Sequence, residues 1–149
     1  MNLQEHDTLK LKGELQIVVR DQQGEIKQSL NVPNLVVTAG KNYIASRIVT
    51  GATTVMSHMA IGTSTTTPAV ANTTLGTEAG RVILASFSAS SNQVTATATF
   101  PAGTGTGAIT EAGIFNASTS GTLLCRTTFP VVNKAAGDSI AITWVVTVS

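Results

Sequence analysis

The stretch 93–100, QVTATATF, alternates apolar and hydroxyl side chains over its whole length. Its apolar positions are Val94, Ala96, Ala98 and Phe100. Successive side chains of a strand point to opposite faces of a sheet, so this period of two predicts a strand with one buried face. The last stretch, 139–148, repeats the pattern with apolar side chains at every second position from Ile140. The chain is therefore predicted to be mainly β.

Shorter apolar stretches between turn-forming clusters indicate further strands. They cover residues 56–61, 81–89, 108–115 and 122–129. Two hairpins follow from this order, 81–89 with 93–100 and 108–115 with 122–129. Several short strands at regular spacing predict an antiparallel β-sandwich or a jelly-roll-like barrel. Residues 62–76, which are rich in Thr, Pro and Ala, are predicted to form a long surface loop.

The first 33 residues carry an alternating pattern of their own. Leu11, Leu15, Ile17 and Val19 occupy apolar positions in it. A turn sequence at 21–24 and a weaker alternation at 26–32 complete a predicted N-terminal β-hairpin. Because an isolated hairpin is marginal in water, its apolar face must dock either on the body or on a partner. We expect residues 1–33 to form an arm on a β-sandwich body, 34–149, that folds without it, and the four side chains to contact a neighbouring subunit by strand addition.

One short helix is predicted at residues 39–49. Thr38 is a suitable N-cap, and Tyr43, Ile44 and Ile48 follow it at helical spacing. Residues 50–54 are predicted to link this helix to the body.

Charged residues make up only 11% of the chain, against about 25% in a typical soluble protein, and the net charge is +1. The chain instead holds 24 Thr and 12 Ser, whose hydroxyls lose water at a lower cost than ions do. Such a surface suits an interface with another protein. The near-neutral charge gives no electrostatic attraction to nucleic acid or to anionic membranes. No apolar run approaches the ~20 residues of a membrane span, and no signal peptide is visible.

No catalytic, cofactor or metal site can be assembled from the sequence. His58 has no further potential metal ligand near it, and His6 lies in a polar N-terminal segment that we expect to be disordered. The glycine-rich 103–107 lacks the lysine and the helix of a phosphate-binding loop. Cys125, the only cysteine, is expected to be a small buried apolar residue in a protein that folds in a reducing cytosol. We therefore expect a protein that is not an enzyme and that uses no cofactor.

Four charged residues lie in or beside the apolar strands, namely Glu78, Arg81, Glu111 and Arg126. Charged side chains on strands mostly face water, which is the simplest interpretation. The alternative is that they form ion pairs across strands or subunits, where half-buried charges fix register and the choice of partner. Glu111 and Arg126 fall on opposite strands of one predicted hairpin, so they are the preferred pair.

Several motifs within residues 31–149 resemble a known group of proteins. They are NLVVTAGKNYIA (34–45), MAIGT (59–63), LGTE (75–78) with Arg81, ITEAGIF (109–115) and GTLLCRT (121–127). The chain resembles the small structural proteins of tailed bacteriophages, which include head decoration (cement) proteins and modules of tail fibres and baseplates. The resemblance implies a β-sandwich subunit that binds an assembled shell or tail of the virion.

Within that group, the brevity of the chain favours a decoration protein. It would be made in the cytoplasm of the bacterial host, bind the major capsid protein on the outer surface of the head, and stabilise the shell by bridging its subunits. Symmetric shells offer symmetric sites, so a homodimer or homotrimer is expected, with the loop 62–76 as a second contact. The alternatives are a tail, baseplate or fibre-associated structural protein, and a carbohydrate- or receptor-binding module. The last is disfavoured because only Tyr43 and Trp144 could stack on a sugar ring.

Overall fold

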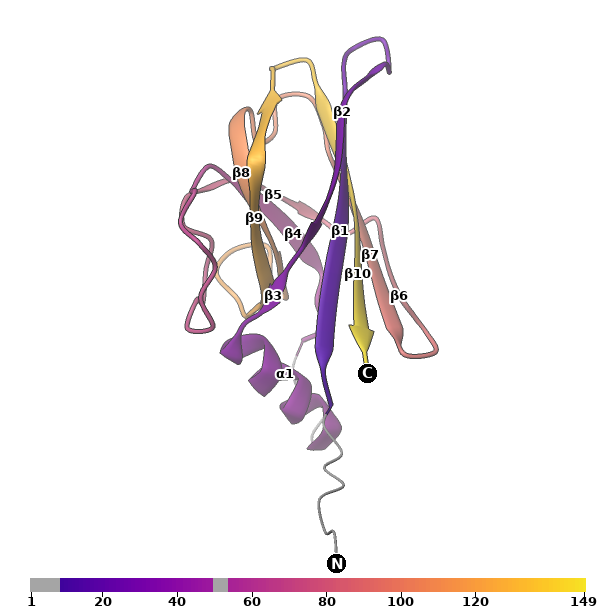
Figure 1. Cartoon of the computed structure of the whole chain (residues 1–149), viewed down its shortest axis with the longest axis vertical. Helices are drawn as coiled ribbons and strands as arrows, with labels where there is room; N and C mark the ends of the chain where they lie inside the picture. The colour runs from indigo at the N-terminus through magenta and orange to yellow at the C-terminus, as the bar shows by residue number, and fades with distance from the viewer. Residues whose placement is uncertain (1–8, 50–53) are drawn as a thin grey trace, which may run out of the picture.

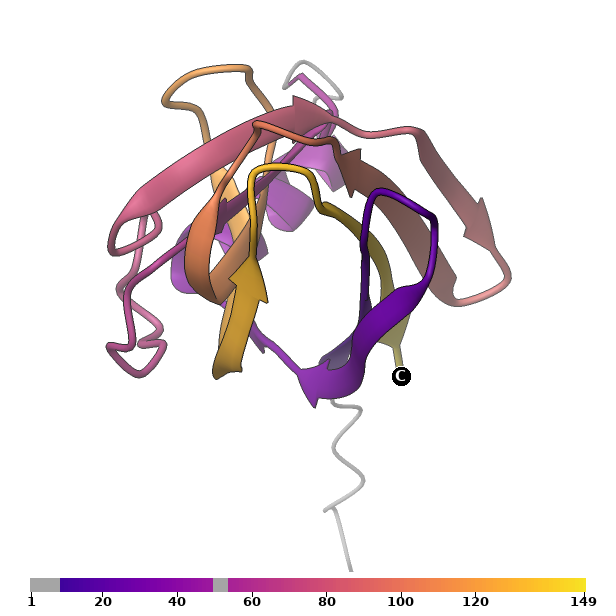
Figure 2. The ribbon, with the colours of Figure 1, turned by 90° about the horizontal axis from the view of Figure 1, so that it is seen from above.

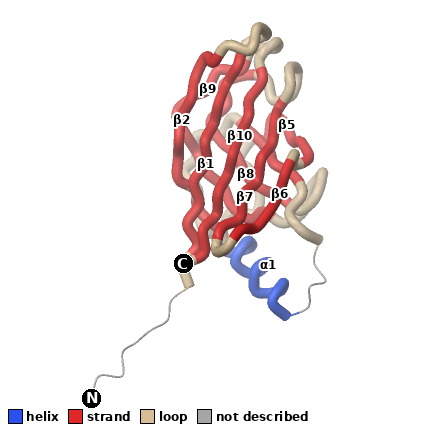
Figure 3. Tube along the Cα trace, turned by 90° about the vertical axis from the view of Figure 1, so that its right-hand side faces the viewer, coloured by secondary structure: helices blue, strands red, loops and turns tan. Residues whose placement is uncertain are grey.

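The computed structural model describes residues 9–49 and 54–149, which form two five-stranded antiparallel sheets and one helix (Figure 1). In order across sheet A lie β2 (Ile26–Pro33), β1 (Leu11–Arg20), β10 (Ser139–Val148), β7 (Gln93–Phe100) and β6 (Ser86–Ser90). In order across sheet B lie β3 (Leu35–Val36), β9 (Leu123–Lys134), β8 (Gly107–Phe115), β4 (His58–Gly62) and β5 (Glu78–Ile83). The helix is α1 (Thr38–Val49), at one end of the molecule (Figure 3).

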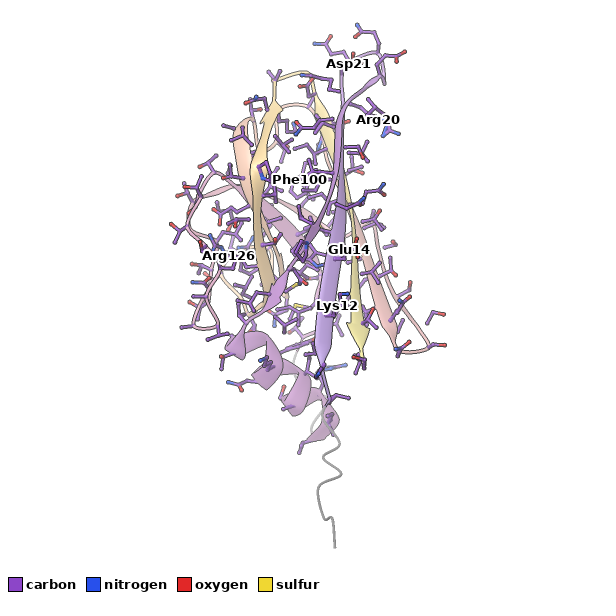
Figure 4. The ribbon with its side chains drawn as sticks, in the orientation of Figure 1. Lys12, Glu14, Arg20, Asp21, Phe100 and Arg126 are labelled. Carbon is purple, nitrogen blue, oxygen red and sulfur yellow. The ribbon has the colours of Figure 1, made fainter. Side chains whose placement is uncertain are left out.

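The two sheets face each other around a common core, as the view along the long axis shows (Figure 2). The described strands form two separate ladders and do not close into a barrel, so the mainly β, sandwich prediction is confirmed. The alternating patterns that predicted β7 and β10 place their apolar side chains inside, Phe100 among them (Figure 4). Trp144 of β10 pairs with Ala96 of β7, so the small alanine side chain leaves space in the core for the large indole ring.

The N-terminal hairpin is part of the sandwich, which corrects the expectation of a separate arm. β1 pairs over its whole length with β10 and on its other side with β2. Leu15, Ile17 and Val19 are buried in the common core, and Leu11 packs against it. These side chains are occupied within their own chain, so the proposed contacts with a neighbour are wrong for them. A chain that began at residue 34 would leave one edge of β10 and part of the core uncovered.

Gly13 interrupts the apolar face of β1 because another residue fills the space beside it. A Cβ at Gly13 would lie 1.7 Å from Asn34 Oδ1. Asn34 sits at the corner where the chain passes from β2 in sheet A to β3 in sheet B, and its backbone amide donates to the Gly13 carbonyl at 3.0 Å. The glycine therefore allows the first of the crossings that join the two sheets.

The strand predicted at 81–89 is divided between the sheets. β5 pairs with β4 in sheet B, whereas β6 pairs with β7 in sheet A. The chain crosses at Leu84 and Ala85, whose amides donate to Ser57 and Thr97 carbonyls in different sheets. Phe87 lies on β6, the edge strand of sheet A, and is exposed.

The remaining predicted elements are present with shifted ends. The helix begins at Thr38, the strand predicted at 56–61 begins at His58, and the predicted hairpin 108–115 with 122–129 is formed by β8 and a β9 that continues to Lys134. His6 and most of the linker predicted at 50–54 lie outside the described residues. Over residues 9–49 and 54–149, no helix has the length and apolar character needed to cross a membrane.

Candidate functional site

The central part of sheet B is buried on both of its faces. Its inner face contributes to the main core, and on its outer face a second apolar cluster is formed by Val37, Ala60, Leu75, Phe115 and Leu123. β8 is therefore covered on both sides, and all its residues from Ile109 to Phe115 are buried. A charged side chain on this strand cannot reach bulk water, so it needs partners inside the protein.

Glu111 of β8 and Arg126 of β9 form the ion pair that the sequence favoured. Arg126 Nη2 and Nε lie 2.8 and 3.0 Å from Glu111 Oε2. The Glu111 side chain is 0% exposed and that of Arg126 is 2% exposed. Arg126 pairs with Gly113, two residues from Glu111 on the same face of β8, so the two side chains are diagonal neighbours. Figure 4 places Arg126 on the side of the sandwich where the 63–77 loop lies.

The 63–77 loop donates three backbone hydrogen bonds to Glu111. Thr77 N and Ser64 N lie 2.7 and 3.1 Å from Oε1, and Gly76 N lies 2.9 Å from Oε2. Burial raises the pKa of Glu111, but these amides together with Arg126 outweigh it, and the pKa lies below its ordinary value of 4.5. Glu111 is therefore ionised at neutral pH although it is fully enclosed.

Arg126 holds the middle of the same loop. Its Nη2 donates to Thr66 O at 3.0 Å and its Nη1 donates to Asn72 Oδ1 at 3.2 Å. Asn72 Oδ1 also accepts a hydrogen bond from Ala69 N at 2.8 Å, which closes the tip of the loop. The ion pair thus fastens both ends and the middle of a polar loop to the sheet, and gives it a defined conformation.

The backbone approaches the ion pair too closely for larger residues at two positions. A Cβ at Gly62 would lie 2.2 Å from Thr77 O and 2.5 Å from Glu111 Oε1. A Cβ at Gly76 would lie 2.3 Å from Ser64 Oγ. Sequence reasoning included both glycines as the ends of a predicted loop and as members of two family motifs, without a structural role for either. It missed the loop groups that complete the site, because their positions depend on contacts distant in sequence.

Glu78 and Arg81 form a second ion pair, on the edge strand β5. Arg81 Nε and Nη2 lie 2.8 and 2.7 Å from the two carboxylate oxygens of Glu78. Residues three apart on a regular strand point to opposite faces, but an irregularity opposite Ile61 and Gly62 inserts one residue here and brings the two together. The structure therefore contains two Glu–Arg pairs, and it keeps the four predicted residues as two separate contacts.

Arg81 also supports the turn between β8 and β9. Its Nη1 donates to the carbonyl oxygens of Ala117 and Ser120, both at 2.9 Å. Its guanidinium carbon lies 3.8 Å from the centre of the Phe115 ring, within the range of a cation–π contact. The Arg81 side chain is 9% exposed and that of Glu78 is 34% exposed, so this pair faces solvent on one side.

Sequence reasoning missed a third polar centre at the opposite end of the sandwich from α1. The buried Lys134 Nζ donates to Asp138 O and Pro101 O at 2.7 and 2.9 Å, and Lys27 forms an ion pair with Asp138. Burial lowers the pKa of Lys134, opposed by the charge of Asp138. The hydrogen bond from Lys27, followed by that from Ala135 N, lowers the pKa of Asp138. The only signal in the sequence is that Lys134 and Asp138 stand at the two ends of the short segment between two apolar stretches.

The other reactive groups are enclosed or already bonded. Cys125 is fully buried, and burial raises the pKa of its thiol to about 12, so it is protonated at neutral pH. His58 Nδ1 lies 2.8 Å from the hydroxyl of Ser57. Over residues 9–49 and 54–149, no group of three or more His, Cys, Asp or Glu is placed to hold a metal ion. The role that the geometry gives to Glu111 and Arg126 is to hold the loop.

Comparison with protein families gives a match over most of the chain. A model described as "Phage tail-collar fibre protein, N-terminal" matches residues 31–148, from within β2 to the end of β10. Comparisons with curated proteins and with solved structures gave no match. Because the family match covers most of the chain, including both Glu–Arg pairs, this protein belongs to the phage tail-collar fibre family, by its N-terminal domain, and is a structural protein of tailed bacteriophages.

Proposed function

We propose that this chain is a structural component of the tail fibre at the tail collar, and that it acts by binding other virion proteins without catalysing a reaction. The observation that carries the proposal is the family match over residues 31–148. This match favours the tail or fibre role, which was the alternative in the sequence analysis, over the decoration of the head. We accordingly propose a tail protein, and not the major capsid protein, as the partner.

The 63–77 loop supports a binding role. Glu111 and Arg126 fix it through five hydrogen bonds to loop groups, three accepted and two donated. A loop that is ordered before binding loses less conformational entropy when a partner docks on it. Its exposed side chains at Thr65, Thr66 and Thr67 carry no charge that would have to be desolvated. We therefore keep this loop as a proposed contact.

A glycan-binding role has little support from the aromatic residues. Trp144 is enclosed in the core, and Tyr43 is half-buried and packs against it. Trp144 cannot stack on a sugar, and Tyr43 has only part of its surface exposed. An assembly of identical copies remains a proposal, since a fibre built on a symmetric tail would place several copies around one axis.

The test is the copy number of the chain in purified parent particles, measured by quantitative mass spectrometry against the major capsid subunit. A tail-fibre component should be present at a small fraction of the capsid subunit, and gold-labelled antibody should mark the tail in electron micrographs. An amount comparable to the capsid subunit, with label over the head, would restore the decoration hypothesis. Absence from the particles would refute both.

A further inference from the structure

The helix α1 lies at one end of the sandwich (Figure 3), and large apolar side chains are exposed at this end. Ile48 and Val49, at the end of the helix, are 80% and 83% exposed, and Leu9, where the described chain begins, is 70% exposed. Single exposed apolar residues are normal on a protein surface, whereas a contiguous group marks an interaction site. These residues therefore indicate an interaction site only if they form one continuous surface.

A groove joins the apolar residues into one surface. It has a volume of about 580 Å³ and lies between α1 and the starts of β1 and β3. Ile44 and Ile48 follow one another on one face of α1, Leu9 and Leu11 form the facing wall, and Leu35 lies on β3 between them. We call this surface the α1 groove. Its volume falls within the range of ordinary binding pockets, roughly 300–1,000 Å³.

The charges of the α1 groove are all of one sign. Lys10 on the β1 side and Lys41 on α1 both line it, and no Asp or Glu belongs to its described lining. Two ammonium groups beside an apolar surface complement a partner with apolar side chains and carboxylates. A second copy seated symmetrically on this groove would bring two more lysines and no carboxylate to the contact, and like charges juxtaposed in an interface cost several kcal/mol. The charge pattern thus favours a different, acidic partner.

We propose that the α1 groove binds an amphipathic acidic segment of another phage protein, with its apolar side chains between α1 and β1 and its carboxylates on Lys10 and Lys41. An amphipathic helix lying in an apolar groove is a recurring mode of peptide recognition. The inference deepens the proposed function and rests on it, because a tail component needs an attachment site. The particle measurement above tests the function, and the binding experiment below tests the groove alone.

The experiment uses the full chain and two synthetic amphipathic helical peptides. Both carry leucine on the apolar face, and the polar face carries glutamate in one and lysine in the other. Fluorescence anisotropy should show saturable binding of the glutamate peptide only. Ile48→Glu should weaken that binding about tenfold or more, while Lys41→Glu should abolish the preference for the glutamate peptide or reverse it. Ile83→Glu is the matched control, because Ile83 is 70% exposed on β5, outside the groove.

Four results would overturn the proposal. They are failure of the wild type to bind the glutamate peptide, equal binding of both peptides, an equal loss in Ile83→Glu, and a glutamate preference that survives Lys41→Glu. Light scattering on the same samples could give a fifth contradicting result. If the wild type forms oligomers and Ile48→Glu dissociates them, the groove is occupied by a second copy of the chain. Thermal melts of each variant establish that it is folded, which we expect because both isoleucines are exposed.

Discussion

Two Glu–Arg pairs lie on sheet B, and they share their chemistry but not their surroundings. Glu111 and Arg126 sit on the central strands β8 and β9 under the 63–77 loop, with almost no exposed surface. Glu78 and Arg81 sit on the edge strand β5, where the carboxylate is one-third exposed. In the first pair, both Glu111 and Arg126 form hydrogen bonds with the 63–77 loop. In the second pair, only Arg81 forms hydrogen bonds with a neighbouring turn.

The difference shows that burial, and not the ion pair itself, decides what such a contact does. At an exposed site, water screens the attraction and replaces a lost partner, so the pair contributes little. At an enclosed site, the desolvation cost offsets much of the attraction, and a pair is then better at fixing one conformation than at adding stability. Losing one partner there leaves an uncompensated charge. We therefore assign the buried pair to loop conformation and the exposed pair to local support of a turn.

The largest effect that separates the pairs should come from removing one arginine at a time. Arg126→Met leaves the Glu111 carboxylate buried without its cation and should lower the free energy of unfolding by about 3–5 kcal/mol. Arg81→Met should cost about 1–2 kcal/mol, because Glu78 can be hydrated. Urea denaturation of both variants measures the contrast. Equal losses would mean that burial does not distinguish the two sites.

The next largest effect should be the coupling free energy that a double-mutant cycle measures for the buried pair. Glu111→Gln and Arg126→Met each leave the other charge unpaired, while the double variant leaves no charge behind. The double change should therefore cost less than the sum of the single changes, by about 0.5–3 kcal/mol. The same cycle on Glu78 and Arg81 is the matched control and should show weaker coupling. Additive losses at Glu111 and Arg126 would show that their measured roles are independent.

The sequence predicted much of the β-sandwich but only half of the site. The alternation in 93–100 and 139–148 forecast two central strands, and the hairpin register brought Glu111 and Arg126 together. Periodicity could not predict the crossing at 84–85, because a strand that changes sheets keeps its local pattern while its pairing partner changes. It also could not reveal that Ser64, Gly76 and Thr77 would aim their amides at one carboxylate. Every residue except proline has a backbone N–H, so the residue type does not show which amides will donate to a carboxylate.

The N-terminal hairpin is present as predicted, but the expectation that it forms a separate arm failed for a related reason. Alternation in β1 correctly indicated one buried face, but it carries no information about which surface buries that face. The pattern was compatible with an appended arm, whereas the strand lies between β2 and β10. Leu15 and Ile17 have the same pattern in either arrangement. Only the pairing of β1 with β10, which is distant in sequence, distinguishes a separate arm from a strand within the sandwich.

Acid should destabilise the protein by protonating Glu111, and the direction of this effect follows from the pKa of that carboxyl group. The pKa of Glu111 is lower in the folded protein than its ordinary value of 4.5, so the folded state releases this proton more readily than the unfolded state does. The resulting stability is present above about pH 4.5 and is lost as the pH falls through the folded-state pKa. Glu111→Gln should therefore flatten the decline of stability below pH 4.5 in denaturation curves taken over a pH series.

Asp138 supplies the internal reference for that experiment. Its pKa is also lowered, first by the hydrogen bond from Lys27, so it contributes to the same acid decline. Glu111→Gln should keep a residual slope, and the further change Asp138→Asn should reduce it again. A slope in Glu111→Gln identical to that of the wild type would show that the carboxylate does not gain its stabilisation from ionisation.

The smallest expected effect is the loss of the exposed carboxylate. Glu78→Gln keeps the size and one oxygen acceptor of the side chain, and Arg81 retains its bonds to the carbonyls of Ala117 and Ser120 and its contact with Phe115. The change should therefore cost only about 0.2–1 kcal/mol, and added salt should reduce the cost further because exposed charges are screened. Glu111→Gln measured in the same salt series should change little, since water and ions do not reach it. A loss in Glu78→Gln as large and as salt-independent as that in Glu111→Gln would end the distinction between the two pairs, and would assign the edge strand a structural role equal to that of the buried site.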